Sequence, residues 1–593
     1  MNFLKTFAAS FIAVITAIVI GIPIIFIVIG GIFASIGSSQ DQVEVKSGTI
    51  LKMSLSGVIT ETETGNPIEL DLGDLLGVPG AGNTRNIGLF QLLRKIEQAK
   101  NDKKVKGIYL NLTGTVGTGW ANLRSIRDAL LEFKSDGKFI YAYSELYTEK
   151  AYYLASVADK VYLPPEGMLE FNGLASSRMF YKGMFDKVNL EPKVFKVGTF
   201  KSAVEPYLRK DMSEASKLQT EEYLKDIWNI FIEDVSASRS LSPEKLNELA
   251  DNFIMGEGPQ AKKEGLIDEV LYESDVLDRL KEAVGKESDE SLELLAFKKF
   301  MKVPGKYKSS KNKIAVIFAE GAINSGKSSQ GSIGSETVIS QLRKARKDKK
   351  IKAIVLRINS PGGSALASDM MANEIRLCKA EKPVIASFGD VAASGGYYMG
   401  APCDYIFARR NTITGSIGIF GMWMELSQAL ENHIGITFDA VETHEHANLG
   451  DPSFPLTKAE EAFIQAKIER GYGSFIEVVR SGRNFRDSAA VDAIAQGRVW
   501  SGQAAKERNL IDAYGELDDA IAYAAQQVGI EEDYKIHQFK PSDNPFEEIF
   551  KDFMVDIRSN DPLYQELETL RKIKQTFPTN GTYALMPYDL KIE

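Results

Sequence analysis

The N-terminal part of this chain carries a long apolar run without charge. No residue between Thr6 and Gln40 is charged. A membrane-spanning helix needs about 20 consecutive apolar residues, whereas the core of a cleaved signal peptide has only about 7–15. We therefore predict an uncleaved anchor in residues 1–45, with a transmembrane helix over about residues 7–33. Lys5 precedes the run and acidic residues follow it, which places the N-terminus in the cytoplasm and the body on the other side.

Beyond the anchor, short apolar runs alternate with helix-like segments. In the second half, apolar residues at helical spacing follow Ser335, and the apolar run IKAIVLRI comes next at 351–358. A helix-like segment over 365–378 and the apolar run PVIASF at 383–388 follow. Apolar runs without strict alternation, separated by helices of about 10–15 residues, indicate a mostly parallel sheet covered on both faces. The pattern predicts an α/β fold.

The pattern occurs twice, in the same order. The sequence DKKVKGIYLNLTG at 102–114 matches DKKIKAIVLRINS at 348–360, and AYYLASVADKVYL at 151–163 matches GYYMGAPCDYIFA at 396–408. The two pairs are offset by 246 and 245 positions, so the intervening segments are collinear. Self-similarity of this kind indicates duplication of one structural unit.

The duplication predicts the domain organisation behind the anchor. We expect an N-terminal repeat domain over 46–284 and a C-terminal repeat domain over 313–540. The charged stretch between them, 285–312, is typical of a linker. The charge-mixed tail, 541–593, is not explained by the repeat.

Composition excludes several classes of protein. The chain has 593 residues, is 44% hydrophobic and carries a formal charge of −9, which argues against a disordered, collagen-like or polytopic membrane protein. A modest acidic excess gives no reason to expect a nucleic-acid partner. Two cysteines, Cys378 and Cys403, cannot build a disulfide framework or a zinc site by themselves.

The sequence GAINSGKS at 321–328 satisfies the phosphate-loop pattern but lacks its context. A phosphate loop opens a helix at its Lys-Ser pair, and that helix N-terminus holds the phosphates. Here SSQGSIGS follows, with Gly331 and Gly334 where the helix should form. We therefore expect no nucleotide cofactor.

Two glycine-rich turns in the second repeat are the best candidates for chemistry. SPGGS at 360–364 and GDVAASGGYY at 389–398 each come between an apolar run and a helix-like segment. Ser394 can act there as a nucleophile, with the N–H groups of Gly363 and Gly395 as oxyanion donors. Taken singly, each turn could equally be an ordinary strand-to-helix turn with a serine cap. Their occurrence one crossover apart favours an acyl-transfer site.

A serine nucleophile needs a base, and the residues alone leave its identity open. The chain has four histidines, all after Ser394: His433, His444, His446 and His537. His444 and His446 are the only clustered pair, but no carboxylate lies at a diagnostic spacing. A desolvated lysine is the other choice. In VFKVGTFKSAVEP, Lys196 and Lys201 are comparable by spacing, and a solvated structural lysine is the ordinary interpretation of either.

At these residues the chain resembles the signal peptide peptidase A family in its long, tandem-repeat form. That family belongs to the Clp-protease/crotonase superfamily and uses a Ser–Lys dyad. The resemblance covers nearly the whole chain, with GDVAASGGYY and VGTFKSAVEP as its most specific blocks. It implies that Ser394 is the nucleophile and Lys201 the general base, and that Gly363 and Gly395 are oxyanion donors. It also implies a homotetramer.

The repeat places half of this dyad in each copy. The position equivalent to Ser394 in the first copy is Glu149, and NLTGTVGTG replaces SPGGS there. The position equivalent to Lys201 in the second copy falls at or near His444. We therefore expect the active site to form where the two domains meet, within one chain or across an oligomer.

The combined expectation is a membrane-anchored serine endopeptidase that needs no metal or other cofactor. The resemblance implies hydrophobic peptide substrates, such as cleaved signal peptides, and a single-pass protein of the bacterial inner membrane with its catalytic body in the periplasm. Two alternatives remain: an inactive, membrane-tethered scaffold of the same fold, and an acyl-CoA enzyme of the crotonase type.

Overall fold

The computed structural model describes seven segments of the chain. These segments are 43–63, 86–114, 116–252, 256–305, 309–329, 331–539 and 581–585. The predicted transmembrane helix at about 7–33 and most of the tail at 541–593 lie outside them. Within the described segments, no helix is long and apolar enough to cross a membrane.

The first repeat is built on a six-stranded parallel sheet. Its strands follow the order β12-β8-β6-β4-β1-β13, and all neighbours run parallel. The strands are β1 (Thr49–Ser54), β4 (Val105–Asn111), β6 (Phe139–Tyr143), β8 (Lys160–Leu163), β12 (Glu269–Val270) and β13 (Leu294–Ala296).

The second repeat has the same strand order, β24-β20-β19-β17-β14-β25, within an eight-stranded sheet. These strands are β14 (Lys313–Glu320), β17 (Ile351–Ser360), β19 (Val384–Ala393), β20 (Tyr405–Ala408), β24 (Ala513–Tyr514) and β25 (Lys535–Gln538). The end of β19 also pairs with β21 (Ile413–Gly415), and β21 pairs with β23 (Val499–Ser501). The predicted α/β fold and tandem duplication are both confirmed.

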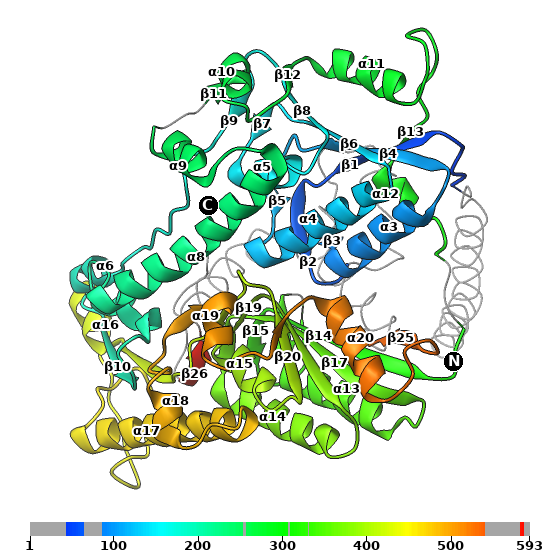
Figure 1. Cartoon of the computed structure of the whole chain (residues 1–593). Helices are drawn as coiled ribbons and strands as arrows, with labels where there is room; N and C mark the ends of the chain where they lie inside the picture. Colours follow the sequence, from blue (N-terminus) through cyan, green and yellow to red (C-terminus); the bar gives the residue numbers. More distant parts are fainter. Residues whose placement is uncertain are drawn as a thin grey trace, which may run out of the picture.

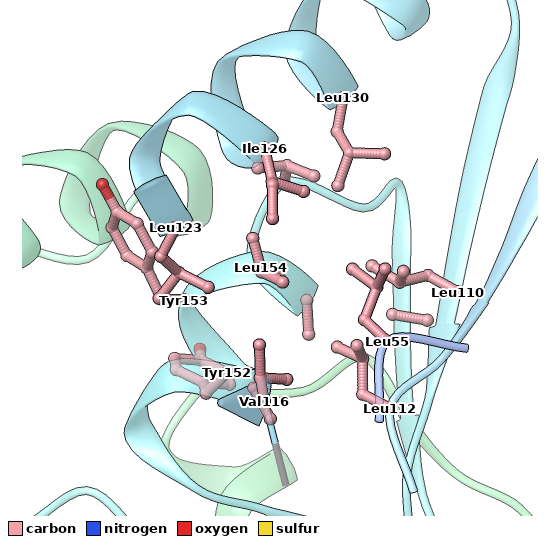
Figure 2. Close-up of a cluster of buried hydrophobic side chains, with 14 of the residues drawn as sticks. Leu55, Leu110, Leu112, Val116, Leu123, Ile126, Leu130, Tyr152, Tyr153 and Leu154 are labelled. Carbon is pink, nitrogen blue, oxygen red and sulfur yellow. The ribbon is translucent and has the colours of Figure 1, made fainter. Parts of the chain in front are cut away.

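Helices cover these sheets with the apolar faces that the sequence spacing predicts. Helix α3 (Leu89–Asn101) buries Leu89, Leu92, Ile96 and Ala99, which recur every three or four residues. Its counterpart is α13 (Ser335–Lys347). In the first repeat, side chains of α4 (Trp120–Ser135) and α5 (Glu149–Ala155) close over leucines at the strand ends (Figure 2).

The segment between the repeats is partly a sheet element. Strand β13 lies within 285–312, the predicted linker, and pairs with β1 through Leu294 and Leu295. It occupies the place that β25 occupies beside β14 in the second repeat. The connecting stretch is therefore shorter than the charge pattern suggested, because the apolar sequence LELLAF supplies the last strand of the first sheet.

A third sheet joins the two repeats. Strand β10 (Glu191–Lys196) belongs to the first repeat in sequence, but it pairs antiparallel with β22 (Phe420–Glu425) of the second. In Figure 1, β10 accordingly lies in the lower half of the molecule, away from the sheet of its own repeat. The order of this sheet is β10-β22-β26-β18-β15-β16, with β15 (Ala322–Asn324), β16 (Ser332–Gly334), β18 (Gly362–Ser364) and β26 (Gly581–Leu585).

Candidate active site

Ser394 stands at a strained turn between β19 and α15 (Gly395–Gly400). Its backbone has φ 55° and ψ −116°, an unusual conformation for a residue with a side chain. Two hydrogen bonds hold the turn: Ser394 N–H donates to Gly415 O over 2.8 Å, and Tyr398 N–H donates to Ser394 O over 2.8 Å. Strain that the surroundings maintain in this way is concentrated at functional sites.

Lys201 reaches Ser394 because β10 crosses to the second repeat. After β10 the chain turns at Gly198, whose φ is +100° and where a Cβ would lie 2.5 Å from the backbone of Gln496. Lys201 follows and is completely buried. Its Nζ donates to Ser394 Oγ over 2.9 Å. The two residues lie 193 positions apart and come from different repeats of one chain.

The environment of Lys201 favours its uncharged form. Burial alone lowers the pKa of the Lys201 ammonium well below the ordinary lysine value. Nζ also donates to Ser416 Oγ over 3.1 Å and to Ser416 O over 3.2 Å. In the neutral amine, two N–H groups can remain on Ser416, which leaves the lone pair for the hydroxyl of Ser394. This arrangement suits proton abstraction.

Ser416 is a site residue that sequence reasoning missed. It follows β21, is completely buried, and has a positive φ of 49°. The available signal was its place in TITGSIGIFG, a third glycine-rich turn, directly after a strand. Two glycines complete the wall around the lysine: a Cβ on Gly497 would lie 2.7 Å from Lys201 Cβ, and one on Gly418 would lie 3.2 Å from Lys201 Cδ.

The two predicted oxyanion glycines lie in β18 and at the start of α15, the elements that follow β17 and β19. Gly363 is in β18 opposite Ile323, and a Cβ there would meet Ile323 O at 2.1 Å, so only glycine fits. Gly395 is the first residue of α15, and the first N–H groups of a helix have no acceptor within the helix. Burial of both residues keeps these groups in a dry environment.

The remaining sequence candidates lie elsewhere. Lys196 is in β10 opposite Phe420 and partly exposed. His444 is exposed and hydrogen bonded to its neighbour Thr443, while His446 contacts Glu460. His433 lies in the exposed helix α16 (Ser427–Ile434), and His537 lies in β25.

Neither the first-repeat counterpart of the Ser394 turn nor the phosphate-loop pattern at 321–328 forms a comparable site in the described chain. Glu149, at the counterpart of Ser394, is buried and accepts a hydrogen bond from Asn172 N–H. After 321–328 the next helix, α13, begins only at Ser335, as the glycines predicted.

In the described part of the chain, no group of three or more His, Cys, Asp or Glu is arranged to hold a metal ion. Cys378 and Cys403 are both free and buried.

Comparison with known proteins adds independent evidence. The family model described as "Peptidase family S49" matches residues 132–287 and 376–531, and the model described as "Clp protease" matches residues 306–404. "Protease 4" of Salmonella typhi is 37% identical over 506 residues, which cover 84% of this chain and 81% of that protein. "Protease 4" of Haemophilus influenzae is 38% identical, covering 77% and 75% respectively. "Serine protease SPPA, chloroplastic" of Arabidopsis thaliana is 34% identical, covering 82% and 70%.

Proposed function

The chain belongs to peptidase family S49 and is a serine peptidase, and on this premise we propose that Ser394 and Lys201 form its catalytic dyad. The 2.9 Å contact between Lys201 Nζ and Ser394 Oγ, made between two completely buried residues, is the observation that carries the proposal. Membership of a peptidase family argues against the acyl-CoA enzyme and favours an active enzyme over an inactive scaffold.

In the proposed mechanism, neutral Lys201 removes the proton of Ser394 as Oγ attacks the scissile carbonyl carbon. The peptide C–N bond then breaks, and the protonated lysine gives its proton to the leaving amine. Water, activated by the neutral amine of Lys201, then hydrolyses the acyl-enzyme and releases Ser394. Ser416 keeps Nζ aimed at Oγ through both steps.

The carbonyl oxygen of the substrate becomes negatively charged during each attack. We assign its stabilisation to the N–H groups of Gly363 and Gly395, which flank Ser394 on neighbouring turns. Fixed backbone donors in a dry pocket need no reorganisation as the charge develops. The close contact of Gly363 with Ile323 supports this assignment, because it fixes the position of the turn.

The substrate is an extended peptide in this proposal. Strand β26 of the chain's own tail lies between β18 and β22, with Ala584 opposite Gly363 and Tyr583 opposite Phe420. A peptide bound by strand addition would take the same path beside the oxyanion turn. The apolar run at 7–33 favours anchoring in the bacterial inner membrane with the body in the periplasm. Hydrophobic peptides left in that membrane, such as cleaved signal peptides, are the matching substrates.

The test is hydrolysis of a fluorogenic apolar peptide by the full-length chain in detergent. We expect Ser394→Ala and Lys201→Ala each to lower kcat/KM by about 10³-fold or more, while Lys196→Ala keeps near wild-type activity. A lysine of the same segment thus serves as the matched control. Activity that survives in Lys201→Ala would overturn the dyad. A folded wild-type chain that cleaves apolar and polar peptides equally would overturn the substrate class.

A further inference from the structure

The backbone that carries Lys201 is irregular, so other groups have to hold it in place. Lys201 lies between β10 and the short helix η1 (Ser202–Val204) and belongs to neither. Its amine nevertheless reaches Ser394 Oγ at 2.9 Å. Misplacement of a reacting group by about 1 Å can lower a rate by about 100-fold. The contacts that fix residues 200–202 therefore bear on the reaction.

One side chain binds the residues on both sides of Lys201. Gln219 lies on α8 (Glu214–Arg239) in the first repeat and is completely buried. Its Nε2 donates to Phe200 O over 3.1 Å and to Ser202 Oγ over 2.7 Å. These acceptors belong to the residues directly before and after the lysine. The amide of Gln219 therefore spans the backbone of Lys201.

The same amide also binds the second repeat, close to the nucleophile. Gln219 Oε1 accepts a hydrogen bond from Val499 N–H of β23 over 3.2 Å. Val499 lies opposite Gly415 of β21, and Gly415 O accepts from Ser394 N–H. Gln219 thus connects the segment of the base with the sheet edge that holds the turn of the nucleophile.

The hydrogen-bond partners fix the orientation of this amide. Val499 N–H can only donate and Phe200 O can only accept, so the amide oxygen faces Val499 and the nitrogen faces Phe200. Ser202 Oγ donates to Phe200 O over 3.0 Å, which leaves its lone pairs to accept from Nε2. Both N–H groups and the oxygen of Gln219 are therefore paired, as burial of a polar group requires.

The repeat identifies the position that corresponds to Gln219 in the second copy. Ser213 caps α8 and Thr457 caps α17 (Lys458–Gly482), each with its own side chain. These caps are 244 positions apart, and so are the matching sequences LID at 266–268 and 510–512. The register between them is therefore continuous.

This register places Phe463 at the position of Gln219. Phe463 is 55% exposed, whereas Gln219 is completely buried. The second repeat lacks the lysine of the dyad, and it also lacks the amide. A glutamine that only stabilised the shared fold would be equally useful in both copies. The amide occurs instead in the copy that supplies Lys201.

We propose that Gln219 is a positioning residue of the peptidase reaction, which fixes the backbone of Lys201 so that its amine faces Ser394 Oγ. The inference rests on the proposed Ser–Lys dyad. Gln219 acts through the lysine rather than on the substrate. Its task differs from that of Ser416, because Ser416 binds the amine itself and Gln219 binds the backbone on either side of it.

Replacing Gln219 by Met tests this role at nearly constant side-chain size. The variant loses all three hydrogen bonds, so the lysine is held less firmly. In hydrolysis of a fluorogenic apolar peptide by the full-length chain in detergent, we expect kcat to fall by about 10- to 100-fold with a nearly unchanged KM. Gln341→Met makes the same change at a buried glutamine of α13 and should keep near wild-type kcat. Wild-type kcat in Gln219→Met would overturn the inference.

Replacing Gln219 by Glu separates positioning from folding. Glutamate keeps an acceptor for Val499 N–H, but its carboxylate has no N–H for Phe200 O or Ser202 Oγ. A carboxylate beside this segment stabilises the protonated form of Lys201, so we expect the acidic limb of the kcat/KM profile to move to higher pH. Loss of folded protein would lower kcat/KM by one factor at every pH. A profile of unchanged shape would therefore show a structural role only, and would overturn the inference.

Lys201→Ala, measured beside these variants, distinguishes failure of the inference from failure of the dyad. An inactive Lys201→Ala together with a fully active Gln219→Met would remove the positioning role and leave the dyad intact. An active Lys201→Ala would overturn the dyad and, with it, the role of Gln219. The account predicts an inactive Lys201→Ala, a slowed Gln219→Met and a shifted pH profile in Gln219→Glu.

Discussion

At the scale of single residues, the site depends on a lysine that has been removed from water. No ionised partner contributes to the lowered pKa of Lys201, and burial alone accounts for it. Sequence spacing left Lys196 and Lys201 comparable, because burial is a property of the folded chain. The resemblance to a family chose between them. Sequence reasoning could identify Ser394 because its Gly-Gly turn has a local signature. It could not identify Ser416, because the proposed role of that residue depends on a lysine 215 positions away.

Replacing Lys201 by Met tests the burial argument through stability. Unfolded, this lysine binds a proton at any pH below about 10.5, whereas folded it binds one only below its lowered pKa. The wild type should therefore gain stability with rising pH between these two values, and lose it as pH falls. Lys201→Met lacks this dependence. Urea unfolding between pH 6 and about 10 checks the difference, and parallel curves for the two proteins would contradict it.

Replacing Ser416 by Ala tests the positioning of the amine. The variant removes one of three acceptors around Nζ, so the lone pair is aimed less well at Ser394. We expect kcat to fall by about 10- to 100-fold with a nearly unchanged KM. Ser387→Ala, at a buried serine that contacts Arg357 instead, is the control. A pure loss of folded protein would lower the amount of active enzyme without changing the pH profile of the remainder.

At the scale of elements, strands that cross between sheets decide the geometry. The alternating pattern correctly predicted the strands and helices of both parallel sheets. It could not show that β10 joins the second repeat, because a strand's partner is not encoded in its own period. Nor could it place β26, since the tail has no counterpart in the repeat. The sequence pattern also missed β13 inside the expected linker, because a three-residue strand is too short to show a period.

Removing residues 581–593 tests whether β26 occupies the substrate path. A tethered segment competes with substrate at a high effective concentration, so its loss should raise kcat/KM for a short peptide several-fold. The control removes only 586–593 and leaves β26 in place. Equal kcat/KM values in the two truncated proteins would show that β26 does not compete.

At the scale of the whole molecule, the proposed dyad depends on how the two repeats meet. A buried polar cluster holds them together beside β19, the strand that precedes Ser394. Arg357 and Asn122 bond Glu61, whose N–H donates to Glu320, while Asp390 accepts from the backbone of Asn122. Burial, with the neighbouring charge of Glu61, raises the pKa of Glu320 to about 8, and burial raises that of Asp390 to about 6. The cluster contains three carboxylates and one arginine.

The raised pKa of Glu320 predicts how this interface responds to pH. Its contribution to stability is fully present below about 4.5 and is lost as pH rises towards about 8, because the folded state then has to hold a buried charge. Glu320→Gln should remove that loss. Between pH 5 and pH 9, its free energy of unfolding should therefore fall less than that of the wild type. Glu336→Gln, on the exposed face of α13, should leave the pH dependence of unfolding unchanged.

Complementation between two inactive chains tests the central claim, that Ser394 and Lys201 of one chain form the dyad. Chains with Ser394→Ala and chains with Lys201→Ala, carrying different tags, are produced together and purified through both tags. Peptide hydrolysis by the mixed assembly is then compared with that of each variant alone. The structure predicts no recovery, since every chain lacks one half of its own dyad. Recovered hydrolysis would show that the lysine of one chain serves the serine of another, and would contradict the account.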